Sequence, residues 1–210
     1  MTMITSLLTL TKHDVQALKI KDPYSLHRVV YSLYEDVRNE DEKRGSKASG
    51  FLYADLGGDF KGRKILLLSN REPKPVVDGT PLELLSKPVP EKLLDYDRYR
   101  FKVVVNPTRR DNNSRKLVPV RGKEEILNWF VERASNSWGF IVAPDEIQLD
   151  DLKVLSFKAK KGQQVTISQA AISGILAVKE RDRFKHSFTH GIGRARAFGC
   201  GLLQVVPISN

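Results

Sequence analysis

The sequence is poor in cysteine and has no long apolar run. Its 210 residues include a single cysteine, Cys200, and no pattern of paired cysteines and histidines. An internal disulfide framework and a structural zinc site are therefore excluded. No apolar run approaches the roughly 20 residues that cross a bilayer, and the start of the chain lacks the basic region and small-residue cleavage site of a secretory signal. We expect a cytoplasmic protein in a reducing environment.

Two motifs that suggest a bound metal or nucleotide are incomplete. His186 and His190 stand four residues apart on a predicted helix, as in zinc hydrolases, but the adjacent glutamate and a third ligand are missing. The glycine-rich stretch "GIGRARAFGCGLL" at 191–203 precedes a strand and not a helix, so it does not match a dinucleotide-binding loop. We therefore expect no metal and no cofactor.

The sequence is rich in positive charge, and the excess lies in its second half. The formal net charge is +10 at pH 7. Residues 1–97 contain 15 Lys and Arg against 15 Asp and Glu, which leaves 20 against 10 for residues 98–210. Segregated positive charge attracts polyanions, which favours nucleic acid or an anionic membrane surface as the partner. A basic face that is merely solvated explains the charge alone equally well.

The first half of the chain predicts a strand, a helix and a hairpin in that order. The pattern of apolar residues favours a strand at 3–10 and a helix at 24–37. Asp22 can cap the free N–H groups at the helix start, and Pro23 fits its first position. The stretches "GFLYADL" and "RKILLLS" predict the hairpin, and "LELLS" at 82–86 predicts at most a short helix.

The same order recurs in the second half. We expect a strand in "RYRFKVVVNP", a helix at 122–135, strands within 152–179, a helix in "RDRFKHSFTHGI" and a closing strand in "GLLQVVPI". A strand, a helix and a hairpin make the front of a ferredoxin-like unit. The sequence therefore predicts an α+β fold of two tandem ferredoxin-like, RRM-like domains at residues 1–97 and 98–210.

Three segments of the second half are candidate phosphate-binding sites. An irregular loop is expected at 106–116, where cations can grip phosphates or simply be solvated. The predicted hairpin tip "FKAKKGQQ" can enter the groove of a duplex, although lysines there also prevent edge-to-edge association. The glycines of 191–203 can present N–H groups to a phosphate, with a tight structural connection as the alternative. The candidate residues are Arg109, Arg110, Arg115, Lys116, Lys158, Lys160, Lys161, Gly191, Gly193, Arg194 and Arg196.

The glycine-rich stretch also resembles the signature of a known family. Its pattern G-I-G-x-A-x-A-x-G-x-G-L-L, followed by a short strand, is similar to that of the CRISPR RNA-processing endoribonucleases, in particular the CasE branch of the type I-E Cascade complex. "DPYSLHR", "FKVVVNPTRR" and "EEILNWFVERASNSWGF" agree in order and spacing. The resemblance spans nearly the whole chain, whereas "PKPVVDGTPLELLSKPVP" and "VAPDEIQLDDLK" match no part of the family's pattern.

The resemblance implies a specific activity and a specific substrate. Proteins of this family look like two ferredoxin-like domains that bind the hairpin of the CRISPR repeat and cut the precursor RNA at the 3′ base of its stem without a metal. The product remains bound, so such a protein is also a subunit of Cascade, and no membrane partner is implied. The family's active-site tyrosine and histidine match Tyr24 and His27. The implied RNA contacts are the candidates of the three basic segments together with Arg28 and Lys102.

The chemistry of Tyr24 and His27 suits this role independently of the resemblance. Without a metal, the attacking group is the 2′-hydroxyl of the RNA, and proton transfer needs a base and an acid. Histidine titrates near neutrality and can serve as either. Tyr24 precedes it by three residues, so the two share one helix face. A lone histidine at a helix start is otherwise more often a surface or capping residue.

Two alternatives belong to other functional classes. The first is a catalytically silent RNA-binding subunit of the same fold, which keeps the basic surface and lacks only cleavage. The second is a general RRM-like RNA-binding module. Neither half contains the aromatic-rich R-G-F-x-F strand on which such modules stack bases. This lack favours recognition through RNA shape and phosphates.

Overall fold

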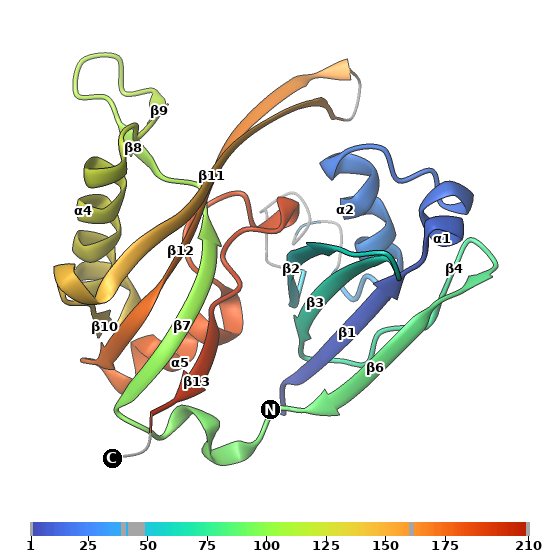
Figure 1. Ribbon diagram of the computed structural model, residues 1–210, viewed down its shortest axis with the longest axis horizontal. Coiled ribbons are helices and arrows are strands. Elements are labelled where there is room, and N and C mark those ends of the chain that lie inside the picture. The colour runs from blue at the N-terminus through green and yellow to red at the C-terminus, as the bar shows by residue number, and fades with distance from the viewer. Residues whose placement is uncertain (1, 39–40, 42–48, 160–161, 209–210) are drawn as a thin grey trace. The chain divides into compact units, whose positions relative to one another are not determined.

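The protein folds into two compact units, as the computed structural model in Figure 1 shows. The structure describes residues 2–38, 41, 49–159 and 162–208. The units comprise residues 1–89 and 90–210, and each has its own antiparallel sheet and its own buried core. The α+β fold predicted from the sequence is confirmed.

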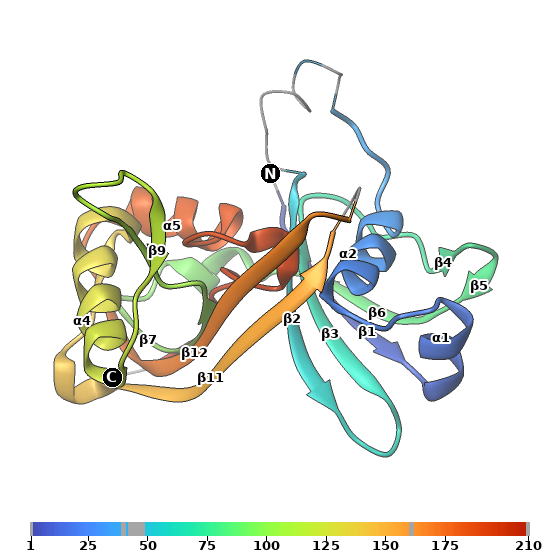
Figure 2. The ribbon, with the colours of Figure 1, turned by 90° about the horizontal axis from the view of Figure 1, so that it is seen from above.

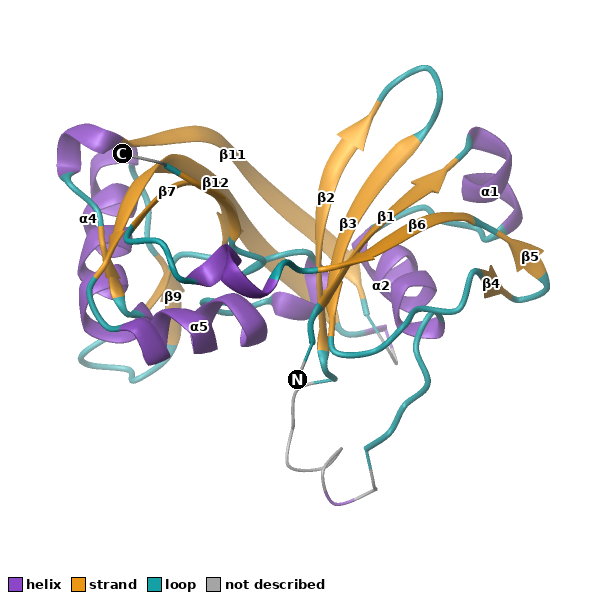
Figure 3. Ribbon diagram, turned by 90° about the horizontal axis from the view of Figure 1, so that it is seen from below, coloured by secondary structure: helices purple, strands orange, loops and turns teal. Residues whose placement is uncertain are grey.

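The first unit has the strand order of a ferredoxin-like domain. Its four-stranded sheet runs β2-β3-β1-β6, with every neighbouring pair antiparallel. Among the described residues, helices α1 and α2 lie between β1 and β2 in the chain, and a short hairpin follows β3 where such a domain has its second helix (Figure 3). The elements are β1 (Ile4–Leu10), α1 (Lys12–Ala17), α2 (Pro23–Ser32), β2 (Phe51–Gly58), β3 (Arg63–Ser69), β4 (Val76–Val77), β5 (Thr80–Pro81) and β6 (Glu83–Pro88).

Two expectations for this unit were wrong. "LELLS" belongs to a strand and not to a short helix, because the segment pairs with β1 and places Leu84 opposite Leu8. The helix expected to reach Val37 ends at Ser32. Leu33 is still buried, so the apolar pattern continues past the end of the helix. Helix α1 and the β4–β5 hairpin had no counterpart among the elements expected from the sequence.

The second unit repeats the same strand order on a larger scale. Its sheet runs β10-β12-β7-β13, and β11 also pairs with β12. A π-helical turn, η2 (Ala134–Trp138), extends the first helix, α4, and α5 precedes the last strand. The other elements are η1 (Glu91–Leu94), β7 (Arg98–Val105), β8 (Thr108–Arg110), β9 (Leu117–Pro119), α4 (Lys123–Arg133), β10 (Phe140–Ile141), η3 (Pro144–Glu146), β11 (Ile147–Lys158), β12 (Gln164–Val178), α5 (Arg181–His190), η5 (Arg196–Phe198) and β13 (Gln204–Pro207).

The hairpin of β11 and β12 is longer than the sheet to which it belongs. Strand β12 pairs with β11 from Gln164 onward, but its pairing with β7 begins only at Ala170. Beyond that point the hairpin is a two-stranded ribbon, which can be followed in Figure 2. The expected strands within 152–179 are confirmed as this hairpin, although its first strand begins earlier, at Ile147.

The segment before β7 belongs to the second unit. The sequence pattern placed residues 90–97 in the first domain, whereas the structure groups them with residues 98–210. Three bonds explain this. The Tyr99 hydroxyl donates to the Leu93 carbonyl at 2.8 Å, Arg181 donates to the Leu94 carbonyl at 3.0 Å, and Lys185 pairs with Asp95 at 2.9 Å.

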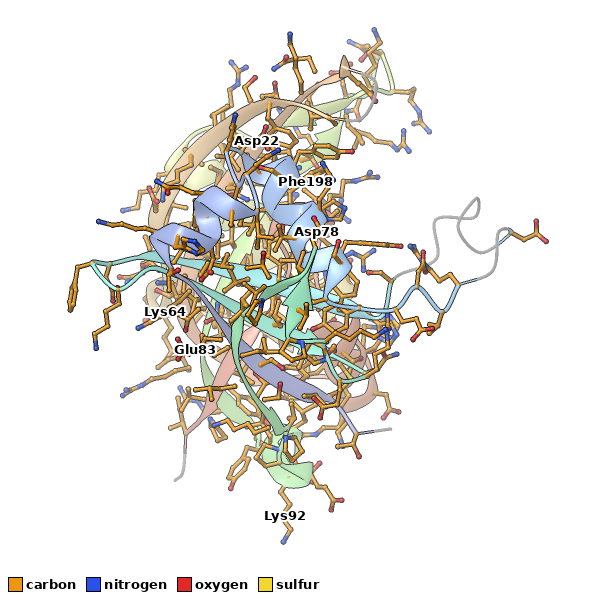
Figure 4. All side chains as sticks on the ribbon, turned by 90° about the vertical axis from the view of Figure 1, so that its right-hand side faces the viewer. Asp22, Lys64, Asp78, Glu83, Lys92 and Phe198 are labelled. Carbon is orange, nitrogen blue, oxygen red and sulfur yellow. The ribbon has the colours of Figure 1, made fainter. Side chains whose placement is uncertain are left out.

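Helix α2 begins with a capping box, and the first residue of the box, Asp22, is labelled in Figure 4. The Asp22 carboxylate accepts from the backbone N–H of Ser25 at 2.7 Å, and the Ser25 hydroxyl accepts from the backbone N–H of Asp22 at 2.9 Å. The bond from the Ser25 N–H is also the main reason why the pKa of Asp22 lies below its usual value. Pro23 occupies the first turn, as expected.

Replacing the cap should loosen this helix in a pH-dependent way. We expect Asp22→Ala to lower the free energy of unfolding by about 1 kcal/mol at neutral pH. Because the pKa of Asp22 is lowered in the folded state, its contribution is present above the unfolded carboxyl pKa and fades as the pH falls through the folded value. Urea denaturation at neutral and acidic pH measures the difference. The exposed Glu83 of β6 provides the control, since Glu83→Ala should shift stability by less than about 0.5 kcal/mol. Equal losses for Asp22→Ala at both pH values would contradict the prediction.

Candidate active site and nucleic-acid interface

One face of α2 carries a row of three aromatic rings. Tyr24, His27 and Tyr31 are three and four residues apart, so their side chains follow one another along the helix. The ring centroids of Tyr24 and His27 are 6.5 Å apart, and those of His27 and Tyr31 are 5.8 Å apart. All three side chains are half-buried. The imidazole therefore stands between two phenol rings at the surface of the first unit.

The far end of this row is anchored by groups that follow the helix. The Tyr31 hydroxyl donates to the Asp36 carboxylate at 2.5 Å and accepts from the guanidinium of Arg38, whose carbon lies 5.6 Å from the Tyr31 ring centroid. Arg38 also pairs with Asp36 at 2.9 Å. Burial, followed by the bond to Asp36, raises the pKa of Tyr31 above its usual value. Tyr31 is thus a neutral hydrogen-bond donor held in one place.

Sequence reasoning missed Tyr31, Asp36 and Arg38. Their only signal was the spacing of four residues between His27 and Tyr31, which the motif at 22–28 does not include. Asp36 lies beyond the end of α2, in a stretch that was expected to be helical, and Arg38 directly follows that stretch. Their contacts with Tyr31 depend on that early end, so the sequence pattern did not reveal them.

The arrangement on α2 is suited to proton transfer at a bound substrate. An imidazole can accept a proton from a hydroxyl or deliver one to a leaving oxygen, and a phenol on the same helix face can donate a hydrogen bond. Arg28 follows His27 directly and is exposed, so it can supply positive charge beside these groups. The candidates Tyr24, His27 and Arg28 therefore lie together in the first unit.

The expected irregular loop at 106–116 is a short, ordered arm. Strands β8 and β9 pair from Thr108 to Arg110, and the backbone of Thr108 accepts a bond from the indole N–H of Trp129 at 3.1 Å. Arg110 donates to the carbonyl of Arg115 at 3.0 Å, which holds the arm together. Arg109 is exposed and, as the neighbour of Arg110 on a strand, points to the other face. The other exposed cations of the arm are Arg115 and Lys116.

The remaining lysine candidates stand at two different places. Lys158 is exposed at the end of β11 and lies opposite Gln164. Lys160 and Lys161 fall outside the described residues. Lys102 is exposed on β7, on the same sheet face as Arg98 and Arg100.

The glycine-rich segment is mainly a structural connection. Gly191, with a φ of +76°, ends α5, and Arg196 donates to the carbonyl of His190 at 2.7 Å, which caps the same helix end. Gly193 also has a positive φ, and Arg194 is exposed. Arg194 is therefore the member of this segment best placed to meet a ligand.

The same segment supports the long hairpin. The Phe198 ring lies 4.9 Å from that of Phe157 on β11, and its carbonyl accepts from the Gln169 amide on β12 at 2.8 Å. Gly201 donates to the carbonyl of Val104 on β7 at 2.7 Å. The segment thus joins the end of α5 to both β7 and the ribbon.

His186 and His190 stack on each other rather than converge on a common point. Their ring centroids are 4.1 Å apart and their planes differ by 13°. Within the described ranges, no three His, Cys, Asp or Glu side chains come together as a possible metal site. No helix among these residues is long and apolar enough to cross a membrane.

Two glycines of the connection offer a direct test of its geometry. Gly201 has a φ of +85°, and a Cβ there would lie 2.4 Å from the carbonyl oxygen of Ile192, whereas Gly193, at +70°, has no atom within 4 Å of the corresponding position. We expect Gly193→Ala to cost about 1 kcal/mol through its backbone conformation alone. Gly201→Ala should cost clearly more, because a backbone atom must also move. Thermal unfolding measures both, and equal losses would contradict this account.

Comparisons with known proteins agree with this architecture. The model of a family described as CRISPR associated protein matches residues 3–207. The CRISPR-associated endoribonuclease Cse3 of Thermus thermophilus is 28% identical over 130 residues, a match that spans 58% of this chain and 61% of that protein. The chain thus aligns with less than two thirds of this relative's length.

Solved structures share the fold over the whole chain. One is Thermus thermophilus Cse3 bound to an RNA representing a pre-cleavage complex, with a TM-score of 0.77, 21% identity, and coverage of 99% of this chain and all of that one. Another is a chain of a CRISPR RNA-guided surveillance complex, with a TM-score of 0.69, 19% identity, and coverage of 98% and 100%. These likenesses confirm the fold of two ferredoxin-like domains.

Proposed function

The chain belongs to the family of CRISPR associated proteins, and on that premise we propose that it is an endoribonuclease that processes CRISPR RNA. It binds the hairpin of the repeat, cuts the precursor at the 3′ base of the stem without a metal, and stays with the product as a subunit of Cascade. The relative of 28% identity is an endoribonuclease, and a protein of the same fold is bound to a pre-cleavage RNA. The function of those proteins supports the proposal.

The observation that carries the proposal is the pair of Tyr24 and His27 on the capped helix α2. In the reaction, the 2′-hydroxyl oxygen attacks the adjacent phosphorus while the bond from phosphorus to the 5′ oxygen breaks. One proton leaves the 2′-hydroxyl and one is added to the departing 5′ oxygen. His27 performs one of these transfers, and the Tyr24 hydroxyl donates a hydrogen bond to the phosphate. The products are a 2′,3′-cyclic phosphate upstream and a 5′-hydroxyl downstream.

The second unit supplies most of the positive charge for holding RNA. Residues 90–210 contain 21 Lys and Arg against 13 Asp and Glu, so this unit carries +8 of the net +10. The exposed face of its central strand presents Arg100 and Lys102, next to Arg98, which is paired with Glu146. An RRM-like module would present aromatic rings on such a face. The charges favour contacts with phosphates over base stacking on the sheet.

The assignment of His27 is tested by separating cleavage from binding. We expect His27→Ala to slow single-turnover cleavage of a repeat hairpin in EDTA by about a hundredfold to ten-thousandfold, because proton transfer is lost. Hairpin affinity should stay within a few-fold of the parent, since many cations share the binding. Tyr24→Phe should cost less than His27→Ala, because only one hydroxyl is removed.

Two controls make this result specific to His27. His13 is 85% exposed on its side chain and lies on α1, so His13→Ala should cleave at the parent rate. A hairpin with a deoxy substitution at the nucleotide 5′ of the cut should bind and remain intact, because the nucleophile is missing. If His27→Ala cleaves at nearly the parent rate while the deoxy substrate remains intact, attack by the 2′-hydroxyl is retained and the assignment of proton transfer to His27 is rejected. A strict requirement for Mg²⁺ would reject the mechanism itself.

The β8–β9 arm generates a prediction about affinity. We expect the double variant Arg109→Ala and Arg110→Ala to weaken hairpin binding and to flatten its salt dependence by about 0.7 to 0.9 in log–log slope for each phosphate that the arm no longer neutralises. Arg183→Ala is a matched control, because Arg183 is exposed but bonded to Glu180 at 3.0 Å. Binding isotherms over a range of salt concentrations measure the slopes. An unchanged slope for the double variant would show that the arm is only solvated.

A further inference from the structure

The turn between β2 and β3 exposes a large aromatic ring from a fixed backbone. Phe60 is 83% exposed. Its neighbours in the turn are tied down, because the Asp59 carboxylate accepts from the N–H groups of Lys61 and Gly62 at 2.8 and 3.2 Å. A Cβ on Gly62 would lie 2.4 Å from the Leu10 carbonyl oxygen, so the turn lies directly against the end of β1. The fixed backbone of the turn therefore keeps the Phe60 ring exposed.

A recess lies beside this turn. It has a volume of about 370 Å³, and its lining combines an apolar surface with two cations and the carboxylate of Asp59. The apolar part comes from β1 and α1, and the cations are Lys12 and Arg63. The lining residues are Leu10, Lys12, Val15, Gln16, Gly58, Asp59, Gly62 and Arg63. Arg63 is paired with the carboxylate of Asp55, so the recess offers an apolar surface beside Lys12.

Lys61 of the turn and Lys64 of β3 add two more cations. The ammonium of Lys61 lies 5.7 Å from the centroid of the Phe60 ring, and Lys64, labelled in Figure 4, lies 3.7 Å from the Asp59 carboxylate. Lys61 occupies one face of the ring, so the other face is open to a planar ligand. An open aromatic face beside cations is the usual platform for single-stranded nucleic acid, because bases stack on the ring while phosphates meet the charges.

The recess lies at the end of the first unit where α2, the helix of the proposed active site, begins. Tyr34, just after α2, stacks on Phe51 with 4.4 Å between ring centroids, and Phe51 lies opposite Ser69, which lies opposite Ile4 at the start of β1. Helix α2 therefore ends near the start of β1 and begins near its end, where the β2–β3 turn also lies. His27 is one turn closer to that end than Tyr31, by about 6 Å at the rise of an α-helix.

We propose that Phe60 and the adjoining recess bind single-stranded RNA next to the repeat hairpin. A base stacks on the open face of Phe60, and the neighbouring phosphates meet Lys12, Lys61 and Lys64. This inference rests on the proposed function, because a precursor that is cut at the 3′ base of a stem has one single strand 3′ of the scissile phosphate and another attached to the 5′ end of the stem. A protein partner is disfavoured by the charges that surround the one aromatic ring, since the centres of protein interfaces are depleted in lysine.

The test compares hairpins with and without single-stranded flanks. Each RNA carries the deoxy substitution at the cut, and separate hairpins carry a 5′ flank, a 3′ flank or no flank. We expect one flank to tighten binding to the parent protein. Phe60→Ala should weaken binding of that RNA by about fivefold to a hundredfold, the range for loss of one stacked base, and leave the hairpin without a flank unaffected. Phe60→Trp should restore the effect of the flank.

A matched control and a second readout make the result decisive. Leu85 is 66% exposed on β6, so Leu85→Ala removes a comparable apolar side chain and should leave binding of every RNA unchanged. A 2-aminopurine in the flank should lose fluorescence on binding to the parent protein and keep it with Phe60→Ala, because stacking quenches the base. The inference is overturned if neither flank adds affinity, or if Phe60→Ala acts equally on all three RNAs. Loss of assembly with other proteins at unchanged RNA affinity would also overturn it and would identify a protein contact.

The outcome for Phe60 is independent of the outcome for His27. Failure of the proposed function would appear as no binding of the hairpin without a flank, or as no cleavage of the all-ribose substrate by the parent protein. Failure of the present inference leaves both of these intact and removes only the effect of the flank.

Discussion

The fixed start of α2 is the constraint on which the first unit depends. The reciprocal bonds between Asp22 and Ser25 set the residue at which the helix begins. The buried side chains of Leu26, Val29 and Val30 set its rotation about its own axis. Because the start and the rotation of the helix are both fixed, the directions in which Tyr24, His27 and Tyr31 leave the helix are fixed as well. A catalytic group needs such preorganisation, because an error of about 1 Å in its position can cost a hundredfold in rate.

The cations of the second unit divide into two kinds. Some serve the fold: Arg98 pairs with Glu146, Arg181 with Asp97 and Lys185 with Asp95, and these pairs fasten the segment before β7 to α5 and neighbouring parts of the unit. Others are exposed on the β8–β9 arm, on the long hairpin and on β7, where Arg100 and Lys102 lie. Only the second kind can exchange its counterions for phosphates without loss to the fold. A count of basic residues therefore overstates the surface that is ready for RNA.

The sequence predicted those features that depend on local patterns. The start of α2, the long strands and their order followed from periodicity and capping, whereas the roles of Tyr24 and His27 came from the family resemblance and stay a prediction. It did not predict β6, because Leu82–Ser86 has neither a strict alternation nor a helical period and becomes a strand only by pairing with β1. The β8–β9 arm likewise depends on the bond between Trp129 and Thr108, which joins residues 21 positions apart. Such tertiary contacts override local propensity.

The support of the ribbon by Phe198 gives the glycine-rich segment a mechanical role. Two-stranded ribbons are marginally stable on their own and twist more than a full sheet. The contacts of Phe198 with Phe157 and Gln169 stabilise the ribbon close to Ala170, where its pairing with β7 ends. Because the ribbon extends beyond these contacts, a small displacement of Phe198 moves the end of the ribbon by a larger amount. Substitutions in the glycine-rich segment would then change the direction of the ribbon at Lys158 and Gln164, even when the substituted residue touches no ligand.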